Sequence, residues 1–384
     1  MEAMVSVEPI IREATLTLYS EEGERGHARA RAGDFPIQYE LDMRDTVLVT
    51  GGAGYIGSHT ARQLIGAGYR VVVLDDFSTG HRWAVAPQAV LIVGDAGDKG
   101  LVGALIEEHS VGAVVHFAGS IVVSESVADP LKYYRNNSGA SRNLIEVCEE
   151  KGVQRFVFSS TAAVYGNPEK LPVVETAPTR PINPYGRSKL ITEWMLEDVA
   201  ASGRARSLRH VILRYFNVAG ASLDGTLGQA TEAATHLIKV ACEAACGVRD
   251  KVTIFGTDYP TPDGTCVRDY IHVEDLARAH LDALRYLERG GASETFNCGY
   301  GRGFSVREVL RMMEKVSGAK LRIEDGARRA GDAAVLVAES SRIRNVLGWG
   351  PQHDNLQVIC STAFEWEGRS VRLPPTESAR RVSG

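Results

Sequence analysis

The sequence has few cysteines and no long hydrophobic run, and both shortages limit what the chain can be. Six cysteines occur in 384 residues, with no Cys-x-x-Cys pair and no spacing typical of a disulfide framework. We therefore expect reduced thiols in a cytoplasmic enzyme. No apolar stretch approaches the roughly 20 residues that a membrane-spanning helix needs, so no membrane association is expected.

Blocks of positive charge are also missing. Lysine and arginine number 43 against 48 aspartate and glutamate, which gives a net charge of −5. A nucleic-acid or membrane-surface partner is therefore not expected. The ten histidines are scattered without a His-x-x-x-His pair, and Cys242 and Cys246 have no partnering histidines nearby. The sequence thus predicts no metal site.

The first 43 residues differ in composition from the rest of the chain. Residues 21–31 in particular are highly charged and poor in large apolar side chains, so we expect residues 1–43 to be a disordered extension. They do not read as a secretory signal, because no basic segment leads into an apolar core. Met43 stands just before the first expected strand, which suggests the hypothesis that translation begins there.

A glycine-rich segment, residues 50–57, joins an expected strand to an expected helix. Its glycines recur three residues apart, between a run of β-branched residues and an apolar-periodic stretch. Such glycines permit a tight turn, let the backbone approach a pyrophosphate and allow close packing of helix on strand. The free N–H groups at the start of the helix would bind phosphate oxygens. The residues expected to do so are Gly51, Gly54, Tyr55, Ile56 and Gly57.

A carboxylate ends the next expected strand, about 20 residues further on. It is Asp75, which follows the apolar run 71–74. In a dinucleotide-binding fold, an acid at this position binds the hydroxyls of the adenosine ribose. The same acid would repel a 2′-phosphate, so the sequence predicts NAD rather than NADP as the cofactor.

Strand and helix patterns alternate through the first half of the chain. Continuous apolar strands that alternate with helices form a parallel sheet covered on both faces. The predicted fold class is therefore α/β, a Rossmann-type doubly wound sheet whose ligands lie beyond the carboxyl ends of the strands. The expected strands are 47–50, 71–75, 89–93, 113–117, 156–159 and 211–215.

The pattern changes after Asn217, where a turn-rich link begins. We assign residues 44–217 to an NAD-binding domain and residues 218–384 to a smaller α/β domain for the substrate, with some segments interleaving with the first. The elements expected after the link are helices at 233–246, 273–287 and 306–316 and strands at 252–255, 296–298 and 321–323.

Tyr185 and Lys189 lie four residues apart at the start of an expected helix, so they share one face. A tyrosine hydroxyl has a pKa of about 10, and a nearby ammonium group or an oxidised nicotinamide lowers it. The pair could then take a proton from an alcohol or sugar hydroxyl as hydride leaves the same carbon. A third group must orient the substrate oxygen. Thr161, just past the strand 156–159, is the first candidate, and Ser160 is the alternative.

These motifs together resemble those of extended short-chain dehydrogenase/reductases, and in particular the NAD-dependent epimerase/dehydratase family. Residues 256–272 are similar more specifically to the UDP-glucose 4-epimerase branch of that family. The resemblance runs from about Val47 to Trp366. It rests on residues 50–57, Asp95, residues 116–119, 159–161 and 164–166, the pair Tyr185 and Lys189, and residues 214–217.

The resemblance implies tightly held NAD and the interconversion of UDP-glucose and UDP-galactose. Tyr185 would take the proton of the sugar 4-hydroxyl while hydride passes from C4 to the nicotinamide. The 4-keto sugar would then turn over and receive the hydride on its other face. The resemblance also implies a homodimer through helices near 129–151 and 184–200, with Leu190, Ile191 and Trp194 available for packing.

The resemblance further implies which residues contact the two ligands. An arginine fork suits a diphosphate on physical grounds too, which supports a role for Arg268. Cofactor contacts would come from Asp95, Phe117, Ala118, Gly119, Asn136, Lys189 and Phe216. Contacts with the UDP-sugar would come from Thr161, Tyr185, Asn217, His236, Leu237, Arg268, Arg329 and Asp332.

The chain departs from the family pattern in three places. A lysine that often follows the Phe-Ala-Gly turn is absent from residues 120–123, and the Asn-Asn-Leu of many members is Thr-His-Leu at 235–237. A pocket position that is tyrosine in some members is Leu336. A smaller side chain there would widen the pocket near the sugar C2 substituent. An epimerase of UDP-N-acetylglucosamine or of a UDP-pentose therefore stays an alternative.

Other functions are weighed against an epimerase. A 4,6-dehydratase or a decarboxylase on the same scaffold needs a carboxylate just after the threonine, where this chain has Ala162 and Ala163. A non-catalytic NAD-sensing protein would keep the glycines, but it would have no need for Tyr185, Lys189 and Thr161 together.

Overall fold

In the computed structural model, the described residues are 44–202, 208–231, 234–329 and 332–370, with residues 18–19 and 25–26. Residues 18–19 and 25–26 form two short antiparallel strands, β1 (Leu18–Tyr19) and β2 (Arg25–Gly26). Both belong to a separate unit, Met1–Met43. The disorder expected for the rest of that segment lies outside the described residues, as do the chain's last residues, 371–384.

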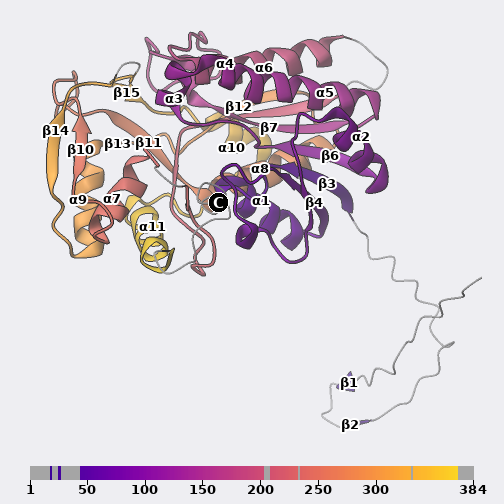
Figure 1. The fold of residues 1–384 in the computed structure, drawn as a ribbon, viewed down its shortest axis with the longest axis horizontal. Helices are drawn as coiled ribbons and strands as arrows, with labels where there is room; N and C mark the ends of the chain where they lie inside the picture. Colours follow the sequence, from indigo (N-terminus) through magenta and orange to yellow (C-terminus); the bar gives the residue numbers. More distant parts are fainter. Residues whose placement is uncertain are drawn as a thin grey trace, which may run out of the picture. The chain divides into compact units, whose positions relative to one another are not determined.

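A seven-stranded parallel sheet is the framework of the unit from residue 44 onward (Figure 1). The order β12-β8-β7-β6-β3-β4-β5 reverses direction between β3 and β6, which makes the carboxyl ends of these two strands the switch point of the sheet. The α/β fold class is thus confirmed. The strands are β3 (Arg44–Thr50), β4 (Tyr69–Asp75), β5 (Val90–Val93), β6 (Val111–His116), β7 (Arg155–Thr161), β8 (Arg209–Tyr215) and β12 (Glu294–Cys298).

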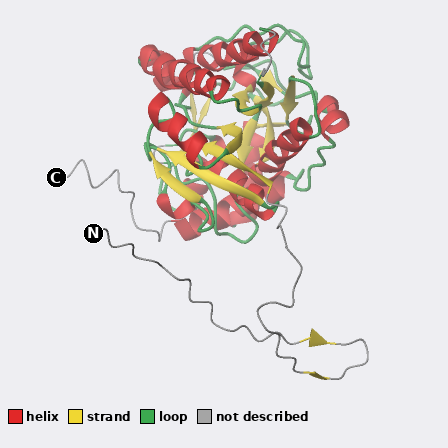
Figure 2. Cartoon of the chain, turned by 90° about the vertical axis from the view of Figure 1, so that its right-hand side faces the viewer, coloured by secondary structure: helices red, strands yellow, loops and turns green. Residues whose placement is uncertain are grey.

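Helices cover both faces of this sheet, as the two views in Figures 1 and 2 show. Alternate residues of β3 enter different cores: Val47 and Val49 pack with α1 and α8, whereas Leu48 packs with α2, α5 and α6. All three are fully buried, as expected for a strand with a helix layer on each side. The helices are α1 (Tyr55–Gly66), α2 (Lys99–Glu108), α5 (Ala140–Glu150), α6 (Pro184–Ala201) and α8 (Val273–Glu288).

Short helical segments connect the strands and helices of the large sheet. They are the 3₁₀ turns η1 (Arg82–Ala84) and η3 (Ala162–Tyr165), the helices α3 (Val123–Ala128), α4 (Pro130–Tyr133) and α10 (Ser341–Leu347), and the π-helical turn η2 (Tyr134–Gly139).

The second part of the chain contributes two small sheets and three helices that pack on one another. Strand β11 lies at the centre of the larger of these sheets, between β13 and β15, and also pairs with β9. The elements are β9 (Asn217–Ala219), α7 (Leu237–Ala245), β10 (Val252–Phe255), β11 (Val267–His272), β13 (Gly303–Ser305), α9 (Val306–Ser317), β14 (Ile323–Gly326), β15 (Val335–Leu336) and α11 (Leu356–Ser370).

Three expected elements differ from the structure. The strand expected at 296–298 is β12, and it joins the large sheet beside β8, where Phe296 is fully buried. The strand expected at 321–323 instead starts at Ile323, because the backbone N–H of Leu321 donates to the Glu314 side chain of α9. The helix expected at 233–246 begins at Leu237, and the start expected for it lies outside the described residues.

No helix of the described ranges is both long enough and apolar enough to cross a bilayer. The six cysteines are all free thiols.

Candidate active site

The glycine-rich turn is closed to side chains at Gly51 and Gly57, the first and last of the glycines spaced three residues apart. Gly51 has a φ of +70°, and a Cβ added there would lie 2.7 Å from the Ala118 nitrogen. A Cβ at Gly57 would lie 2.2 Å from the Gly51 carbonyl oxygen. Gly54 caps α1 without a side-chain hydrogen bond, and a Cβ there would meet only that same carbonyl, at 3.2 Å. The start of α1 therefore presents backbone N–H groups with no side chain in front of them, as the predicted contact with a diphosphate requires.

Asp75, at the end of β4, is held against this turn. Its Oδ2 accepts a hydrogen bond from the Ala53 N–H at 2.9 Å, and its Oδ1 accepts one from the Phe77 N–H at 2.9 Å. Burial raises the pKa of Asp75, while these two donors oppose the rise. Each carboxylate oxygen keeps a second lone pair. The position is therefore compatible with the predicted contact with a ribose hydroxyl.

The turn after β6 lies beside the carboxyl end of β3. The N–H groups of Phe117 and Ala118 both donate to the Thr50 carbonyl, at 2.9 and 3.2 Å. Asn136, in η2, donates to the Ser120 hydroxyl at 3.2 Å. The structure thus brings the segment 117–119 and Asn136 close to the glycine-rich turn, at the switch point of the sheet. Asp95 is exposed beyond β5 and accepts a hydrogen bond from the Gly97 N–H at 2.7 Å.

Helix α6 starts with a cap that fixes the position of Tyr185. The Asn183 side chain accepts a hydrogen bond from the Gly186 N–H at 2.8 Å, and Pro184 occupies the first turn. Tyr185 is 7% exposed and Thr161 is 8% exposed. Burial raises the pKa of the Tyr185 phenol, and a hydrogen bond with Thr161 opposes the rise. The predicted pair of Tyr185 and Thr161 is therefore in contact.

Lys189 lies one turn further along α6 and is 3% exposed. Its Nζ donates to the Ser159 carbonyl oxygen at 3.1 Å and lies 5.0 Å from the centroid of the Phe158 ring. Burial lowers the pKa of the Lys189 ammonium to about 8, against the opposing charge of Glu193. The expected lowering of the Tyr185 pKa by Lys189 is not seen in this structure, because burial of the phenol is the largest influence on it.

Ser160 has a different partner from Thr161. Its hydroxyl donates to Glu193, which is fully buried and pairs with Arg214 through an Nη2–Oε2 contact of 2.6 Å. The Arg214 Nε also donates to both Glu193 oxygens, each at 3.1 Å. Of the two hydroxyls left open by the sequence, that of Thr161 lies next to Tyr185, because the Ser160 hydroxyl meets Glu193, two turns further along α6.

Three of the residues predicted for the sugar nucleotide lie along the small sheet around β11. Asn217 in β9 pairs with Tyr270 of β11, and Arg268 pairs with Leu336 of β15. The Arg268 Nη2 lies 3.8 Å from Asp332 Oδ1. Leu336 also packs on the cluster that contains Phe216, Ala162 and Leu190. This cluster includes Ala162, the residue after Thr161, and therefore connects the small sheet with the region of Tyr185.

The remaining predicted substrate residues make contacts elsewhere. The Arg329 guanidinium lies 3.8 Å from the centroid of the Phe255 ring, at the end of β10. His236 is exposed and its Nδ1 lies 3.0 Å from the Gln229 amide, whereas Leu237 packs on the core at the start of α7. Within the described residues, neither of the latter two forms a hydrogen bond with Tyr185 or Arg268.

Asn137 is a supporting residue that the sequence reasoning missed. It is 2% exposed, and its Oδ1 accepts a hydrogen bond from the Ser120 N–H at 2.7 Å. Its Nδ2 donates to the Ser120 carbonyl at 3.0 Å and to the Ser188 hydroxyl at 2.9 Å. It therefore ties the turn after β6 to α6, next to Lys189. No local signal distinguishes it from Asn136, because both follow the same tyrosine pair.

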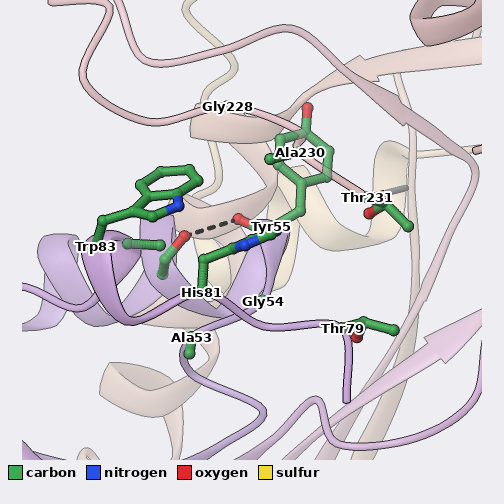
Figure 3. A pocket seen from close by; sticks show the side chains of 11 residues that line it. Ala53, Gly54, Tyr55, Thr79, His81, Trp83, Gly228, Ala230 and Thr231 are labelled. Atoms are coloured by element: carbon green, nitrogen blue, oxygen red, sulfur yellow. Dashed lines mark hydrogen bonds between the residues drawn. The ribbon is translucent and has the colours of Figure 1, made fainter. Parts of the chain in front are cut away.

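One hollow lies directly at the glycine-rich turn (Figure 3). It is a cavity of about 10 Å³. Its walls come from the start of α1, from the segment after β4 and from a loop after β9, and the lining residues are Ala53, Gly54, Tyr55, Ser58, Thr79, His81, Trp83, Ala84, Gly228, Ala230 and Thr231. Within the part of the chain that the structure describes, no group of three or more acidic, histidine or cysteine side chains could hold a metal ion.

Comparison with known proteins agrees with this geometry. Residues 47–299 match the NAD dependent epimerase/dehydratase family. The UDP-glucose 4-epimerase of Azospirillum brasilense is 58% identical over 321 residues, which cover 84% of this chain and 91% of that protein.

Two solved structures are similar to the chain. The UDP-glucose 4-epimerase of Brucella ovis in complex with NAD is 46% identical, with a TM-score of 0.81, and the match covers 84% of this chain and 98% of that one. The UDP-Glc/GlcNAc 4-epimerase of Campylobacter jejuni is 51% identical, with a TM-score of 0.74, and the match covers 85% of this chain and 99% of that one.

The buried ion pair predicts a large loss of stability for Glu193→Gln. This change leaves the Arg214 charge buried without its partner, which typically costs about 3–5 kcal/mol. We expect the free energy of unfolding, measured by denaturant titration, to fall by about 3 kcal/mol. Glu197→Gln, one turn further along α6 and exposed, should change it by less than about 0.5 kcal/mol. Equal, small losses for both variants would show that the pair does not hold α6 against the sheet.

Proposed function

The chain belongs to the NAD dependent epimerase/dehydratase family, and from that premise we propose that it interconverts UDP-glucose and UDP-galactose with bound NAD. The observation that carries this proposal is the burial of Tyr185, Lys189 and Thr161 together at the end of β7, where the Lys189 Nζ donates to the Ser159 carbonyl. This group lies at the carboxyl edge of a sheet whose switch point carries the glycine-rich turn. Solved structures of similar epimerases contain NAD.

Bound NAD would supply the acceptor and donor of the sugar C4 hydride, so the protein must hold the cofactor in one place. The backbone N–H groups at the start of α1 would bind its diphosphate, and Asp75 its adenosine ribose. The turn 117–119 would line the nicotinamide side. Lys189 would lie beside this turn, since a Cβ added at Gly119 would come within 3.8 Å of its Nζ.

Tyr185 would move the proton at the sugar 4-hydroxyl. Its phenol is shielded from water, and Thr161 supplies a second hydroxyl that can hold the same substrate oxygen. Burial keeps the phenol protonated, so removal of its proton would need positive charge nearby. An oxidised nicotinamide would supply that charge when bound, together with the Lys189 ammonium one turn away. The same phenol can return the proton after the sugar has turned, since nothing in an epimerisation consumes it.

The side chains after Thr161 argue against an elimination reaction. Ala162 is 3% exposed and begins η3, and Ala163 follows it. Neither can protonate a departing hydroxyl group, which a 4,6-dehydratase requires. The geometry therefore supports oxidation followed by reduction at the same carbon.

Arg268 and Asp332 would anchor the sugar nucleotide away from the reacting carbon. Their side chains lie 3.8 Å apart, and Arg268 is adjacent to Leu336 in the small sheet. An arginine can bind a diphosphate through two parallel hydrogen bonds, and Arg329, which lies on Phe255, would approach from the end of β10. Anchoring of this kind leaves the hexose ring free to turn over.

The proposal extends to assembly and location. Exposed apolar side chains gather on α3, α4 and α6, which contact one another: Val127 is 60% exposed, Leu131 75% and Trp194 51%. We propose this face as the interface of a homodimer in the cytoplasm, where the enzyme would serve galactose metabolism. Leu190, which the sequence analysis offered for this interface, is instead buried within its own subunit against Phe216.

If the protein is an epimerase that keeps NAD bound, we expect the purified protein to convert UDP-galactose to UDP-glucose without added NAD. Tyr185→Phe should lower kcat by at least about 10²-fold, because it removes the group that carries the proton. The amount of bound NAD should stay unchanged, since the phenol hydroxyl is not what holds the cofactor. Product analysis and acid release of NAD measure the two quantities separately. Full turnover by Tyr185→Phe would show that another group moves the proton, whereas bound NAD without any turnover in the parent protein would favour a non-catalytic NAD-binding role.

Leucine at position 336 leads us to expect that the enzyme also accepts a UDP-sugar with a larger substituent at C2. With leucine at this position, the pocket next to Phe216 and Ala162 should admit the N-acetyl group of UDP-N-acetylglucosamine. Leu336→Tyr should abolish turnover of that substrate while keeping turnover of UDP-galactose. If neither the parent protein nor Leu336→Tyr turns over UDP-N-acetylglucosamine, the protein is not an epimerase of N-acetylated sugars.

A further inference from the structure

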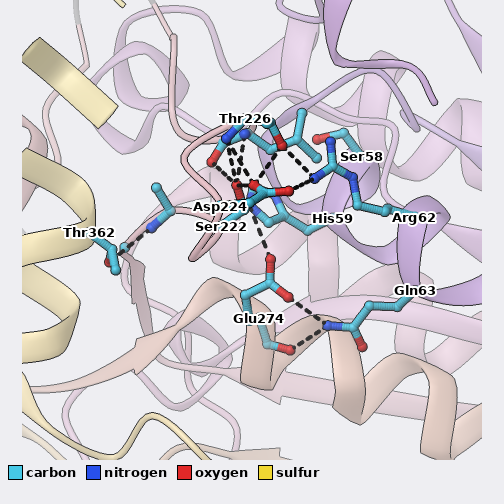
Figure 4. Close-up of polar contacts among 12 residues, drawn as sticks. Ser58, His59, Arg62, Gln63, Ser222, Asp224, Thr226, Glu274 and Thr362 are labelled. Atoms are coloured by element: carbon cyan, nitrogen blue, oxygen red, sulfur yellow. Dashed lines mark hydrogen bonds and ion pairs between the residues drawn. The ribbon is translucent and has the colours of Figure 1, made fainter. Parts of the chain in front are cut away.

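A loop after β9 crosses the start of α1, and we call residues 220–231 the strap. The Tyr55 hydroxyl donates to the Gly220 carbonyl at 2.6 Å. The Arg62 Nη1 donates to Asp224 Oδ2 at 3.1 Å and to the Thr226 hydroxyl at 2.6 Å (Figure 4). These contacts fasten the strap to the helix whose first turn is expected to hold the cofactor diphosphate.

The other side of the strap is fastened to α11. The Trp366 Nε1 donates to the Gln229 carbonyl at 3.0 Å, and the Ala221 N–H donates to the Thr362 hydroxyl at 3.2 Å. Gly228 lies flat on the indole, since a Cβ there would come within 2.3 Å of the Trp366 ring. The strap therefore bridges α1 and the last helix of the described chain.

Trp83 lies against Trp366, the α11 residue that binds the strap. It lies in η1, on the segment that follows Asp75, and its ring centroid is 5.4 Å from that of Trp366. It also stacks on His81, with centroids 5.1 Å apart. Trp83 is 39% exposed, whereas Trp366 is 4% exposed. The two indoles form an aromatic pair across the edge of the strap, and Trp83 supplies the outer, more accessible partner.

The strap, η1 and the glycine-rich turn are almost in contact with one another. The cavity between them is about 10 Å³, which holds about one water molecule. Figure 3 shows Trp83 and Thr79 on one side of this seam and Gly228 and Thr231 on the other. A dinucleotide bound at Gly54 cannot leave through the seam unless the strap and Trp83 separate.

We propose that the pair of Trp83 and Trp366 is a latch that retains NAD in the protein. The proposal rests on the proposed function, since it takes the dinucleotide to lie at the glycine-rich turn. Neither Trp83 nor Trp366 is among the residues proposed to bind the sugar or to take part in the reaction, so the latch would affect release of the cofactor and not the chemical step. The contact between the two tilted indole rings holds η1 against the strap and thereby slows the opening through which the cofactor would escape. An epimerase benefits from such retention, because it regenerates its cofactor in every cycle.

The test is Trp83→Ala, with bound NAD as the readout. Protein is dialysed against buffer without NAD, and the remaining cofactor is released with acid and quantified over time. We expect the variant to lose NAD at least about tenfold faster than the parent. Its turnover of UDP-galactose should fall as NAD is lost and return to the parental kcat when NAD is added, because the reacting groups are unchanged.

Two variants control for this result. Trp83→Phe keeps a stacked ring and should restore most of the retention. Val346→Ala alters a side chain of similar exposure, 41%, on α10 and should release NAD at the parental rate. If Trp83→Ala does not fold, Trp83→Leu gives the same comparison, because it keeps apolar bulk but removes the stacked ring.

The outcomes separate the latch from the proposed function. If the parent holds NAD and epimerises UDP-galactose, but Trp83→Ala retains NAD as long as the parent, the latch is wrong and the epimerase stands. If the parent neither holds NAD nor acts on UDP-galactose when NAD is added, the proposed function fails and the latch fails with it. Faster loss of NAD from Trp83→Ala, rescued by Trp83→Phe, supports the latch.

Discussion

The contact between Tyr185 and Thr161 depends on how α6 is held against the end of β7. Tyr185, Lys189 and Glu193 are spaced by four residues, so they point to the same side of α6. Each reaches the end of β7: Tyr185 contacts Thr161, Lys189 donates to the Ser159 carbonyl, and Glu193 accepts a hydrogen bond from Ser160. The buried pair of Glu193 with Arg214 extends this contact to β8. The position of the phenol is therefore set by three successive turns of one helix.

In this arrangement the hydroxyls of Ser160 and Thr161 have different roles: the first supports the structure and the second belongs to the proposed site. Ser160 points into the protein and joins the buried ion pair, and Thr161 points toward Tyr185. A phenol and an ammonium group that are both buried interact more strongly than they would in water, because the surroundings screen them less. The same burial makes each charge costly, as the low pKa of Lys189 shows. The Lys189 ammonium thus lies one turn of α6 from the phenol that the proposed mechanism would deprotonate.

Much of the fold could be predicted because its signals are local. The strands of the large sheet are short apolar runs, and the glycine spacing with Asp75 identifies the cofactor turn within 30 residues of sequence. The place of β12 could not be predicted, because its pairing with β8 joins segments far apart in the chain. The different partners of Ser160 and Thr161 could not be predicted either, because they depend on which residue of α6 each hydroxyl meets in the folded chain. Trp83 and Trp366 carry no shared sequence signal, and only the folded chain brings them together.

The most direct test of the account is a crystal structure of the protein with NAD and UDP-glucose bound. The account predicts that the Tyr185 hydroxyl and the Thr161 hydroxyl both lie within hydrogen-bond distance of the sugar O4, about 2.6–3.2 Å. It also predicts that C4 faces the nicotinamide. A complex in which O4 is held by other residues, with the Tyr185 hydroxyl out of reach of the sugar, would contradict it.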